Sequence, residues 1–440
     1  MGLYVDDFVY FSPDDAVEKK FERLLAKHLK VDFMDTVEWF LGIHFQWQVT
    51  PDSVSVHLGQ AGFAANLAEQ FNQHHKSPSP LATPYRSGIP IDAIPESTEP
   101  DDNPTLLKRK HSYQSLVGSI GWLAQSTRPD LTPAHSFLSS YNNKPSRGHM
   151  QAALYVLHYI HSTHDYGITF TSENTLPLHT YIQFPSRSDA EAYSDAVPPS
   201  QRNSHRLTTY SDACWGSQIG NAVRAGTLLP LFKFRSMSGG IIFRSGGPIV
   251  WTAIRQEKTA LSSCESEIRA TNEAGKLTVA CRNLIEQLAA AGYPITDASS
   301  PSKLFNDNEA CVKWCHNMTT KSTRYMEHRE NTVREWVQDS SLSISHVKGV
   351  TNPADLFTKE MKDGTHFRRL RDSFMSRSSV FLHPSSVSGT SLAPMAQSSR
   401  LSSSTPDLLS FLLRLPSTHP TTSLCSSHLS SAGRMLLSAG

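Results

Sequence analysis

The sequence has few cysteines and no long apolar run. Its 440 residues include six cysteines, and their spacing does not suggest the disulfide framework of a small secreted domain. No apolar stretch approaches the ~20 residues that a membrane-spanning helix needs. The first residues also lack the basic segment and apolar stretch of a signal peptide. We therefore expect an intracellular protein without a membrane partner, not a secreted, integral-membrane or fibrous one.

An excess of charge of either sign is also absent. Lysine and arginine number 41, aspartate and glutamate 40, and the formal net charge is +1. Overall charge therefore argues neither for nor against nucleic-acid binding, which only a local basic surface can indicate. One basic stretch includes a helix predicted at about 323–338. It predicts contacts with backbone phosphates, and the alternative is an ordinary solvated helix face. The residues concerned are Lys321, Arg324, Arg329 and Arg334.

Strands and helices alternate between about residues 205 and 365, which is typical of an α/β fold. The predicted strands are 208–212, 239–244, 248–251, 303–306 and 343–347, and the predicted helices are 262–290 and shorter ones from about 308 and 352. In the first half, helical periodicity occurs near 16–29, 58–73, 112–126 and 146–162. Residues 171–208 are polar and irregular. The serine-rich sequence after Met375 is predicted to be disordered.

The predicted helix at 262–290 has one buried stripe and an acid at its head. Residues of the stripe recur at steps of three and four: Ala270, Ala274, Leu277, Cys281, Leu284 and Leu288. Glu267 precedes the stripe on the same face. Because burying an unpaired carboxylate is costly, we expect Glu267 to be paired or bound to metal. Glu265 is turned by about 200° around the helix and is predicted to face solvent.

Three more acids stand at the ends of predicted elements. Asp212 lies on or just after the first strand of the α/β segment, Asp307 follows a strand, and Asp355 lies in the first turn of a helix. Taken singly, Asp307 and Asp355 also fit structural roles, as a helix cap or as a partner of the helix dipole. Four converging carboxylates, with Glu267 as the fourth, would repel one another without a cation. They suit two Mg²⁺ ions about 3.5–4 Å apart, the arrangement used for in-line phosphodiester cleavage.

Two other residues bear on this acid cluster. His346 lies on the predicted strand before Asp355, and its role is either to move protons and help release product or to serve as a structural histidine at a strand edge. Asp195 belongs to a repeat of the Asp212 motif, since residues 193–196 and 210–213 both read YSDA. The repeat is followed by Val-Pro-Pro, which ends any strand, and Asp212 is therefore preferred.

The segments around the four acids resemble the ribonuclease H domain of copia-type LTR retrotransposon polyproteins. They are residues 209–216 (TYSDACWG), 261–267 (LSSCESE), 307–310 (DNEA) and 352–359 (NPADLFTK), of which the last is quite specific. The resemblance implies a mixed sheet flanked by helices, with Mg²⁺ or Mn²⁺ held by the four acids. It also implies an RNA/DNA hybrid as the nucleic-acid partner, cleavage of the RNA strand, and no small-molecule cofactor.

The first half resembles the end of a copia-type reverse transcriptase. Residues 4–7 (YVDD) resemble the catalytic turn, which implies Mg²⁺ binding by Asp6 and Asp7, and residues 39–43 (WFLGI) resemble a primer-gripping hairpin. Residues 113–123 and 127–130 (TRPD) match the region downstream, and the likeness extends to about residue 375. The chain begins three residues before the turn, without the fingers and a third acid, so we expect no polymerase activity from it alone.

The predicted organisation follows from these two resemblances. An α+β palm, thumb and connection fragment of a reverse transcriptase occupies 1–175, a linker 176–204, a ribonuclease H-like α/β domain 205–365, and a disordered tail 376–440. The favoured function is metal-dependent cleavage of the RNA strand of hybrids by this Pol fragment. The alternatives are an inactive transposon remnant that at most binds nucleic acid, and a transposase or integrase, which the position of Glu267 disfavours. The implied location is the cytoplasm, in a virus-like particle, or the nucleus.

Overall fold

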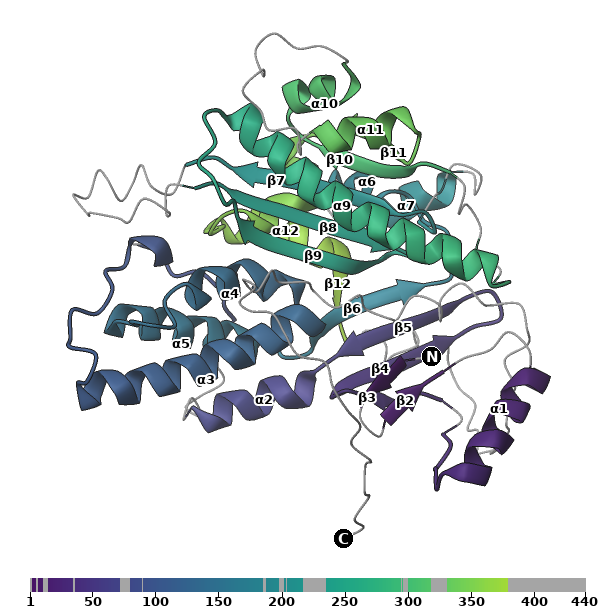
Figure 1. Cartoon of the computed structure of the whole chain (residues 1–440), viewed down its shortest axis with the longest axis horizontal. Helices are drawn as coiled ribbons and strands as arrows, with labels where there is room; N and C mark the ends of the chain where they lie inside the picture. Colours follow the sequence, from purple (N-terminus) through teal and green to yellow (C-terminus); the bar gives the residue numbers. More distant parts are fainter. Residues whose placement is uncertain are drawn as a thin grey trace, which may run out of the picture.

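Two five-stranded sheets organise the fold, which is a mixed α/β one. The computed structural model describes residues 2–4, 7–10, 15–34, 36–71, 80–88, 90–184, 187–197, 202, 204–216, 235–293, 295, 300–317 and 331–378. Figure 1 shows the two sheets as separate layers, with a group of helices beside the sheet nearer the N-terminus. Within these ranges, no helix has both the length and the apolar character needed to cross a membrane.

The sheet of the second half has the strand order β11-β10-β7-β8-β9. Strands β7, β10 and β11 run parallel, and β8 and β9 are antiparallel additions. All five match the predicted strands to within a few residues. Their bounds are Thr208–Cys214 for β7, Met237–Arg244 for β8, Gly247–Arg255 for β9, Ser302–Asn306 for β10 and Leu342–His346 for β11.

The two faces of this sheet are covered by different elements. Helix α9 (Ser263–Ala290) lies on one face, where Thr278 of the helix contacts the hydroxyl of Thr209 at 2.7 Å. The short helix η7 (Pro353–Phe357) lies on the other face, because a Cβ on Gly239 would stand 2.9 Å from the carbonyl oxygen of Ala354. Successive residues of a strand point to opposite faces. Asp212, two residues after Tyr210 and opposite Gly239, therefore belongs to the η7 face.

Two short helices flank the parallel edge of this sheet. Helix α10 (Glu309–His316) begins after Asn308, whose side chain accepts a hydrogen bond from the backbone N–H of Cys311 at 3.0 Å. Helix α11 (Thr332–Gln338) is the described part of the predicted basic helix. A buried apolar cluster joins these helices to the sheet and to α9, and it includes Ile268, Leu304, Trp314, Val333 and Ile344.

The sheet of the first half is antiparallel throughout, in the order β12-β6-β5-β4-β3. Its strands are β3 (Trp39–Phe40), β4 (Ile43–Val49), β5 (Val54–Gly59), β6 (Tyr166–Thr171) and β12 (Met375–Arg377). Leu41 and Gly42 join β3 to β4 with φ values of 52° and 70°, as a tight hairpin turn requires. Near the N-terminus, β1 (Gly2–Tyr4) and β2 (Asp7–Val9) form a separate antiparallel pair.

The helices of the first half overlap the four predicted positions, but the helix predicted at 112–126 begins earlier, at Pro104, and the helix Thr132–Ser139 is not predicted from the sequence. A further correction concerns the second predicted helix. Helix α2 is Ala61–Gln70, and the prediction of a helix from residue 58 is wrong because 54–59 form β5. The alternation of apolar and polar residues in Val-Ser-Val-His-Leu favours a strand there. The remaining helices are α1 (Asp15–His28), α3 (Pro104–Ser126), α4 (Thr132–Ser139) and α5 (Arg147–Ser162), with a short helix η1 (Ile91–Ala93) before α3.

The segment predicted to be irregular contains two helices, α6 (Leu178–Ile182) and α7 (Arg187–Ala196). The backbone N–H of His179 in α6 donates to the hydroxyl of Tyr210 in β7 at 3.2 Å, so this segment packs on the second sheet. The repeated YSDA motif at 193–196 lies at the end of α7, whereas Asp212 lies on a strand. This arrangement agrees with the preference for Asp212.

The end of the described chain returns to the first sheet. Helix α12 (Gly364–Phe374) leads into β12, which pairs with β6 so that Met375 lies opposite Ile168. Residues 376 and 377, predicted to begin the disordered tail, therefore belong to a strand, and the tail from 379 lies outside the described residues. One apolar core contains residues of both halves, among them Tyr159, Phe243 and Phe374.

Candidate metal centre

Three carboxylates meet at the end of β7 where α9 begins. Asp212, Glu267 and Asp307 each offer an oxygen atom, and these atoms all lie within 4.8 Å of one another. Ser211 of β7 pairs with Asn306, the last residue of β10, so Asp212 on β7 stands next to Asp307, which directly follows β10. Glu267 comes from the second turn of α9. The structure thus brings together three of the four predicted acids from three different elements.

Asp212 is buried and held by a single hydroxyl group. The Oγ1 atom of Thr358 donates a hydrogen bond to its Oδ2 atom at 2.5 Å. Burial, reinforced by the negative charges of Asp355 and Asp307, raises the pKa of Asp212 to about 7. The carboxyl group therefore binds a proton readily when no cation is beside it.

Glu267 is buried against an asparagine side chain. The Nδ2 atom of Asn306 donates to its Oε2 atom at 2.9 Å and also to the Oγ atom of Ser211 at 3.1 Å. Burial is the main cause that raises the pKa of Glu267 to about 10, and the charge of Asp212 adds to it. A carboxyl group in this position is ionised at neutral pH only if a nearby positive charge compensates for its burial.

Asp355, the fourth predicted acid, lies beside the group of three rather than in it. The Nζ atom of Lys359 forms an ion pair with its Oδ1 atom, and the Nε2 atom of His366 lies 3.4 Å from its Oδ2 atom. Burial acts to raise the pKa of Asp355, but the contacts with His366 and Lys359 outweigh it and lower the pKa. Asn352 caps the first turn of η7 by accepting from the backbone N–H of Ala354 at 3.1 Å.

Asp307 is half-buried and does not cap α10, since Asn308 has that role. Burial and the charge of Asp355 raise the pKa of its carboxyl group. A Cβ on Gly349 would stand 2.8 Å from its Oδ2 atom, so only glycine fits at that position without displacing the carboxylate. His346 is exposed on β11, and its Nε2 atom lies 3.1 Å from the backbone oxygen of Asp307. The predicted histidine is thus adjacent to the acids.

Glu265 corrects the sequence-based expectation. It was predicted to face solvent, yet it is 3% exposed. Its Oε2 atom accepts a hydrogen bond from the backbone N–H of Leu261 at 2.7 Å, and its Oε1 atom pairs with Arg269 at 2.6 Å. Ser262 caps the same helix end by accepting from the backbone N–H of Glu265 at 3.1 Å. The prediction failed because angular position alone ignores such capping contacts.

The donor set suits a divalent cation of the Mg²⁺ class. Its three acids present oxygen atoms only, which is the ligand type that Mg²⁺ and Mn²⁺ prefer. The raised pKa values of Asp212, Glu267 and Asp307 reflect burial and mutual repulsion, both of which a bound cation would offset. The arrangement of the three acids fits a divalent cation such as Mg²⁺ or Mn²⁺ and does not distinguish between these two ions.

Comparison with known proteins shows similarity to transposon proteins. It is 27% identical over 363 residues to the retrovirus-related Pol polyprotein from transposon RE2 of Arabidopsis thaliana, a match that covers 82% of this chain and 21% of the relative. It is 24% identical over 361 residues to the corresponding polyprotein from transposon TNT 1-94 of Nicotiana tabacum, covering 81% and 23%. The chain is thus similar to Pol polyproteins of copia-type transposons over most of its length. It spans about a fifth of the length of these relatives.

The chain is also similar to a shorter protein that is not described as a Pol polyprotein. The chain is 32% identical over 162 residues to the secreted RxLR effector protein 161 of Plasmopara viticola, a match that covers 37% of this chain and 85% of the relative. No protein-family model matches the chain.

Of the remaining predicted site residues, the described part of the chain includes only Arg334 and the backbone of Asp7. Asp6 lies outside the described residues, and Asp7 begins β2 without a described side chain. The Arg334 guanidinium stacks on the ring of Trp314, 4.3 Å from its centroid, and its Nε atom donates to the Trp314 carbonyl oxygen at 3.0 Å. Its side chain is therefore engaged within the protein. Lys321, Arg324 and Arg329 lie outside the described residues.

Four residues of the centre were missed by the sequence analysis. Thr358 and Lys359 lie in the NPADLFTK segment, whose sequence alone does not indicate that they contact Asp212 and Asp355. Asn306, immediately before Asp307, was recognised only as a strand residue. His366 is eleven positions from Asp355 and lies on a different helix, so no local sequence pattern could have linked them.

Proposed function

We propose that this chain cleaves the RNA strand of RNA/DNA hybrids in a reaction that requires a divalent cation. The observation that carries the proposal is the group of three carboxylates whose oxygen atoms lie within 4.8 Å of one another. The mixed sheet of the second half, with α9 on one face, agrees with the resemblance to ribonuclease H and supports the proposal. The similarity to Pol polyproteins supports a nucleic-acid substrate.

Each residue of the centre has a separate part in this proposal. Asp212, Glu267 and Asp307 would hold the cation, and Asp355 would stand beside it. Bound Mg²⁺ would supply charge stabilisation for the scissile phosphodiester and lower the pKa of an attacking water. Thr358 and Asn306 direct the oxygen atoms of Asp212 and Glu267. His346, exposed next to Asp307, would accept or deliver a proton near the leaving oxygen.

The expected selectivity is for the shape of the hybrid. An RNA strand offers a 2′-OH at each nucleotide, and a hybrid differs in groove width from duplex DNA. Recognition would therefore be independent of base sequence, with RNA/RNA and DNA/DNA duplexes left uncut.

Hybrid cleavage by the purified full chain tests the proposal. An end-labelled RNA/DNA duplex is incubated with Mg²⁺ or with EDTA, beside the variants Asp212→Asn and Asp101→Asn. Asp101 is an exposed acid paired with Lys144, far from the cluster in sequence, and serves as the control. We expect cutting of the RNA strand with Mg²⁺, no cutting in EDTA, and loss of activity in Asp212→Asn only. A folded chain that cuts no hybrid would instead favour the remnant that at most binds nucleic acid.

A further inference from the structure

A buried polar cluster in the first half of the chain has no part in the centre described above. Arg128 and Asp130, from the segment 127–130, form a two-pronged ion pair in which Nε donates to Oδ1 at 2.9 Å and Nη2 to Oδ2 at 2.8 Å. The two side chains are 1% and 0% exposed. A buried ion pair of this kind is often no more stabilising than apolar side chains of the same volume. A contribution to stability therefore does not by itself explain the Arg128–Asp130 ion pair. The contacts of this pair with other residues indicate a further role.

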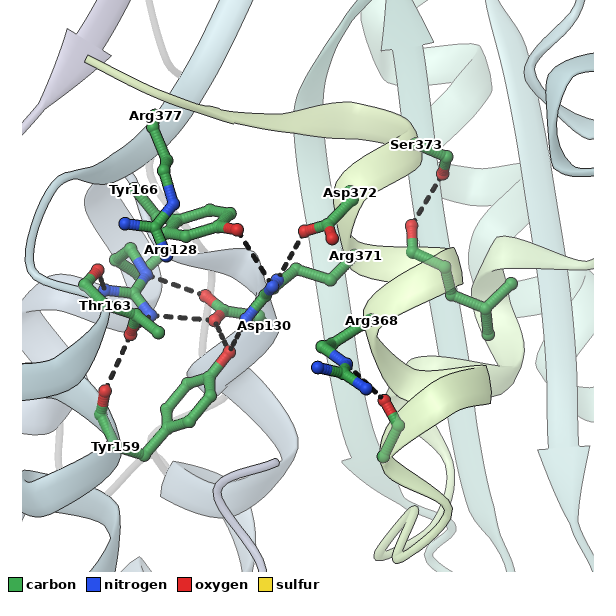
Figure 2. Close-up of polar contacts among 12 residues, drawn as sticks. Arg128, Asp130, Tyr159, Thr163, Tyr166, Arg368, Arg371, Asp372, Ser373 and Arg377 are labelled. Carbon is green, nitrogen blue, oxygen red and sulfur yellow. Dashed lines mark hydrogen bonds and ion pairs between the residues drawn. The ribbon is translucent and has the colours of Figure 1, made fainter. Parts of the chain in front are cut away.

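The cluster connects to helix α12 through a tyrosine hydroxyl. Tyr159 donates to Oδ2 of Asp130 at 2.7 Å and accepts from Nη1 of Arg371 at 2.9 Å. The Nη2 atom of Arg371 donates to the hydroxyl of Tyr166 at 3.0 Å, and its guanidinium lies 4.2 Å from the centroid of that ring. Figure 2 shows Arg371 reaching from α12 toward these residues of the first half. The last turn of α12 is thus fixed by side chains that precede it by some 200 positions.

The first turn of the same helix contacts Asp355, the acid that lies beside the cluster of three. Asp363 caps it by accepting from the backbone N–H groups of Thr365 and His366 at 2.9 and 3.2 Å. His366 then places its Nε2 atom 3.4 Å from Oδ2 of Asp355. From His366 to Arg371 the helix rises only about 7.5 Å, given 1.5 Å per residue. Phe367 and Leu370 between them are fully buried, which prevents the helix from shifting freely.

We propose that Tyr159 and Arg371 are positioning residues for the metal centre, because they fix α12 and thereby fix His366 against Asp355. The inference rests on the proposed function in one respect, since it takes the acid cluster to bind a divalent cation. Lys359 holds one oxygen of Asp355 and His366 faces the other, so the direction of this carboxylate depends on α12. Asp355 stands beside the three proposed ligands, and loss of such outer-shell interactions around a metal site typically weakens metal binding by about 10- to 100-fold.

Mn²⁺ affinity, measured by titration calorimetry on the full chain, tests this link. We expect His366→Ala to weaken Mn²⁺ binding about tenfold and Tyr159→Phe to weaken it by a smaller but measurable factor. Arg371→Lys keeps the charge but cannot reach both tyrosines in the same geometry, and it should act like Tyr159→Phe. The control is Tyr113→Phe, which removes an equally buried hydroxyl that donates to the Leu138 carbonyl at 2.8 Å. This control should lose stability without losing affinity.

A double-variant cycle separates positioning from general destabilisation. If Tyr159 acts through His366, the variant Tyr159→Phe/His366→Ala should bind Mn²⁺ no more weakly than His366→Ala alone. Additive losses would overturn the link, as would equal affinities of Tyr159→Phe and Tyr113→Phe.

The outcomes also distinguish this inference from the proposed function. If the chain binds Mn²⁺ through Asp212 but cuts no hybrid, the proposed nuclease activity is contradicted. The double-variant cycle then still decides whether Tyr159 acts on metal binding through His366. An active chain whose affinity is unchanged in Tyr159→Phe and Arg371→Lys contradicts the link alone. A folded chain that binds no Mn²⁺ contradicts both.

Discussion

The fold shifts the pKa values of different carboxyl groups in opposite directions. The pKa of Asp355 is lowered by its cationic neighbours, whereas those of Asp212 and Glu267 are raised chiefly by burial. Glu360 is a further case, away from the cluster of three. Its Oε1 atom accepts from the backbone N–H of Ile91 at 2.5 Å, and burial raises its pKa to about 7. Each of these groups therefore changes stability over a different pH range.

Glu360 gives the clearest prediction of this kind. Its folded-state pKa exceeds the unfolded value, so the folded chain binds more protons between about pH 4.5 and 7 and becomes less stable as pH rises through that window. Glu360→Gln should remove this loss, which is about 3 kcal/mol for a shift of this size. Urea unfolding in EDTA at pH 4.5 and pH 8 measures it, with the exposed Glu96→Gln as control. Equal pH dependence in Glu360→Gln and wild type would contradict the assignment.

Gly239 gives a second prediction at the level of one residue. An added Cβ would stand 2.7 Å from a methyl carbon of Thr358 and 2.9 Å from the Ala354 carbonyl oxygen. Gly239→Ala should therefore push η7 off β8, break the Thr358–Asp212 hydrogen bond and destabilise the fold by about 1–3 kcal/mol. Mn²⁺ affinity should fall with it.

The matched control for this substitution is Gly118→Ala. Gly118 lies in helix α3 with no atom within 4 Å of an added Cβ. Alanine there should stabilise the chain by about 0.5–1 kcal/mol, because glycine is unfavourable inside a helix. Unchanged Mn²⁺ binding in Gly239→Ala would show that η7 does not orient the acids.

Helix α9 is the element whose first turns bear most directly on the metal centre, because it carries Glu267 close to its N-terminus. Ser262→Ala should remove the cap, lower the free energy of unfolding by about 1 kcal/mol and let the turn that holds Glu267 fray. Asn103 caps α3 by accepting from the backbone N–H groups of Thr105 and Leu106, and Asn103→Ala is the matched control. Thermal unfolding should show similar losses, and calorimetry should show weaker Mn²⁺ binding only in Ser262→Ala. Equal Mn²⁺ affinity in both variants would rule out fraying at Glu267.

The sequence predicted elements well where the signal is local. The stripe of α9 follows in part from its periodicity, because Ala270, Ala274 and Cys281 are buried, whereas Leu277, Leu284 and Leu288 are only half-buried. Asp212 and Asp307 could be placed together because Asp212 lies on one strand of the sheet and Asp307 directly follows its parallel neighbour. Burial of Glu265 depends on a cap and on Arg269, which a helical wheel does not include. Strand β12 pairs with a partner some 200 positions earlier, and no short-range pattern encodes that pairing.

For the whole molecule, the shared core predicts one unfolding event. Residues of both sheets belong to the same apolar cluster. Polar contacts also cross between the halves: Arg255 pairs with Asp92 at 2.5 Å, and Nε1 of Trp251 donates to the Ala124 carbonyl at 2.7 Å. Differential scanning calorimetry should therefore give a single transition for the described fold, with calorimetric and van't Hoff enthalpies equal.

Added Mn²⁺ should move that entire transition to higher temperature, because a ligand that binds only the folded state stabilises everything that unfolds with its site. The shift should be absent in Asp212→Asn. Two transitions, with only one responding to the metal, would show that the halves unfold independently.

The pairing of β12 with β6 also has a consequence for synthesis on the ribosome. Strand β6 ends at Thr171, and its partner β12 begins at Met375. At about 5–20 residues per second, the nascent chain carries an open strand edge for roughly 10–40 s before its partner is made. Such an edge can pair with other chains while it waits. Nascent copies made close together on one messenger RNA are thus most exposed to mispairing during that interval, and translation speed between the two strands sets how long it lasts.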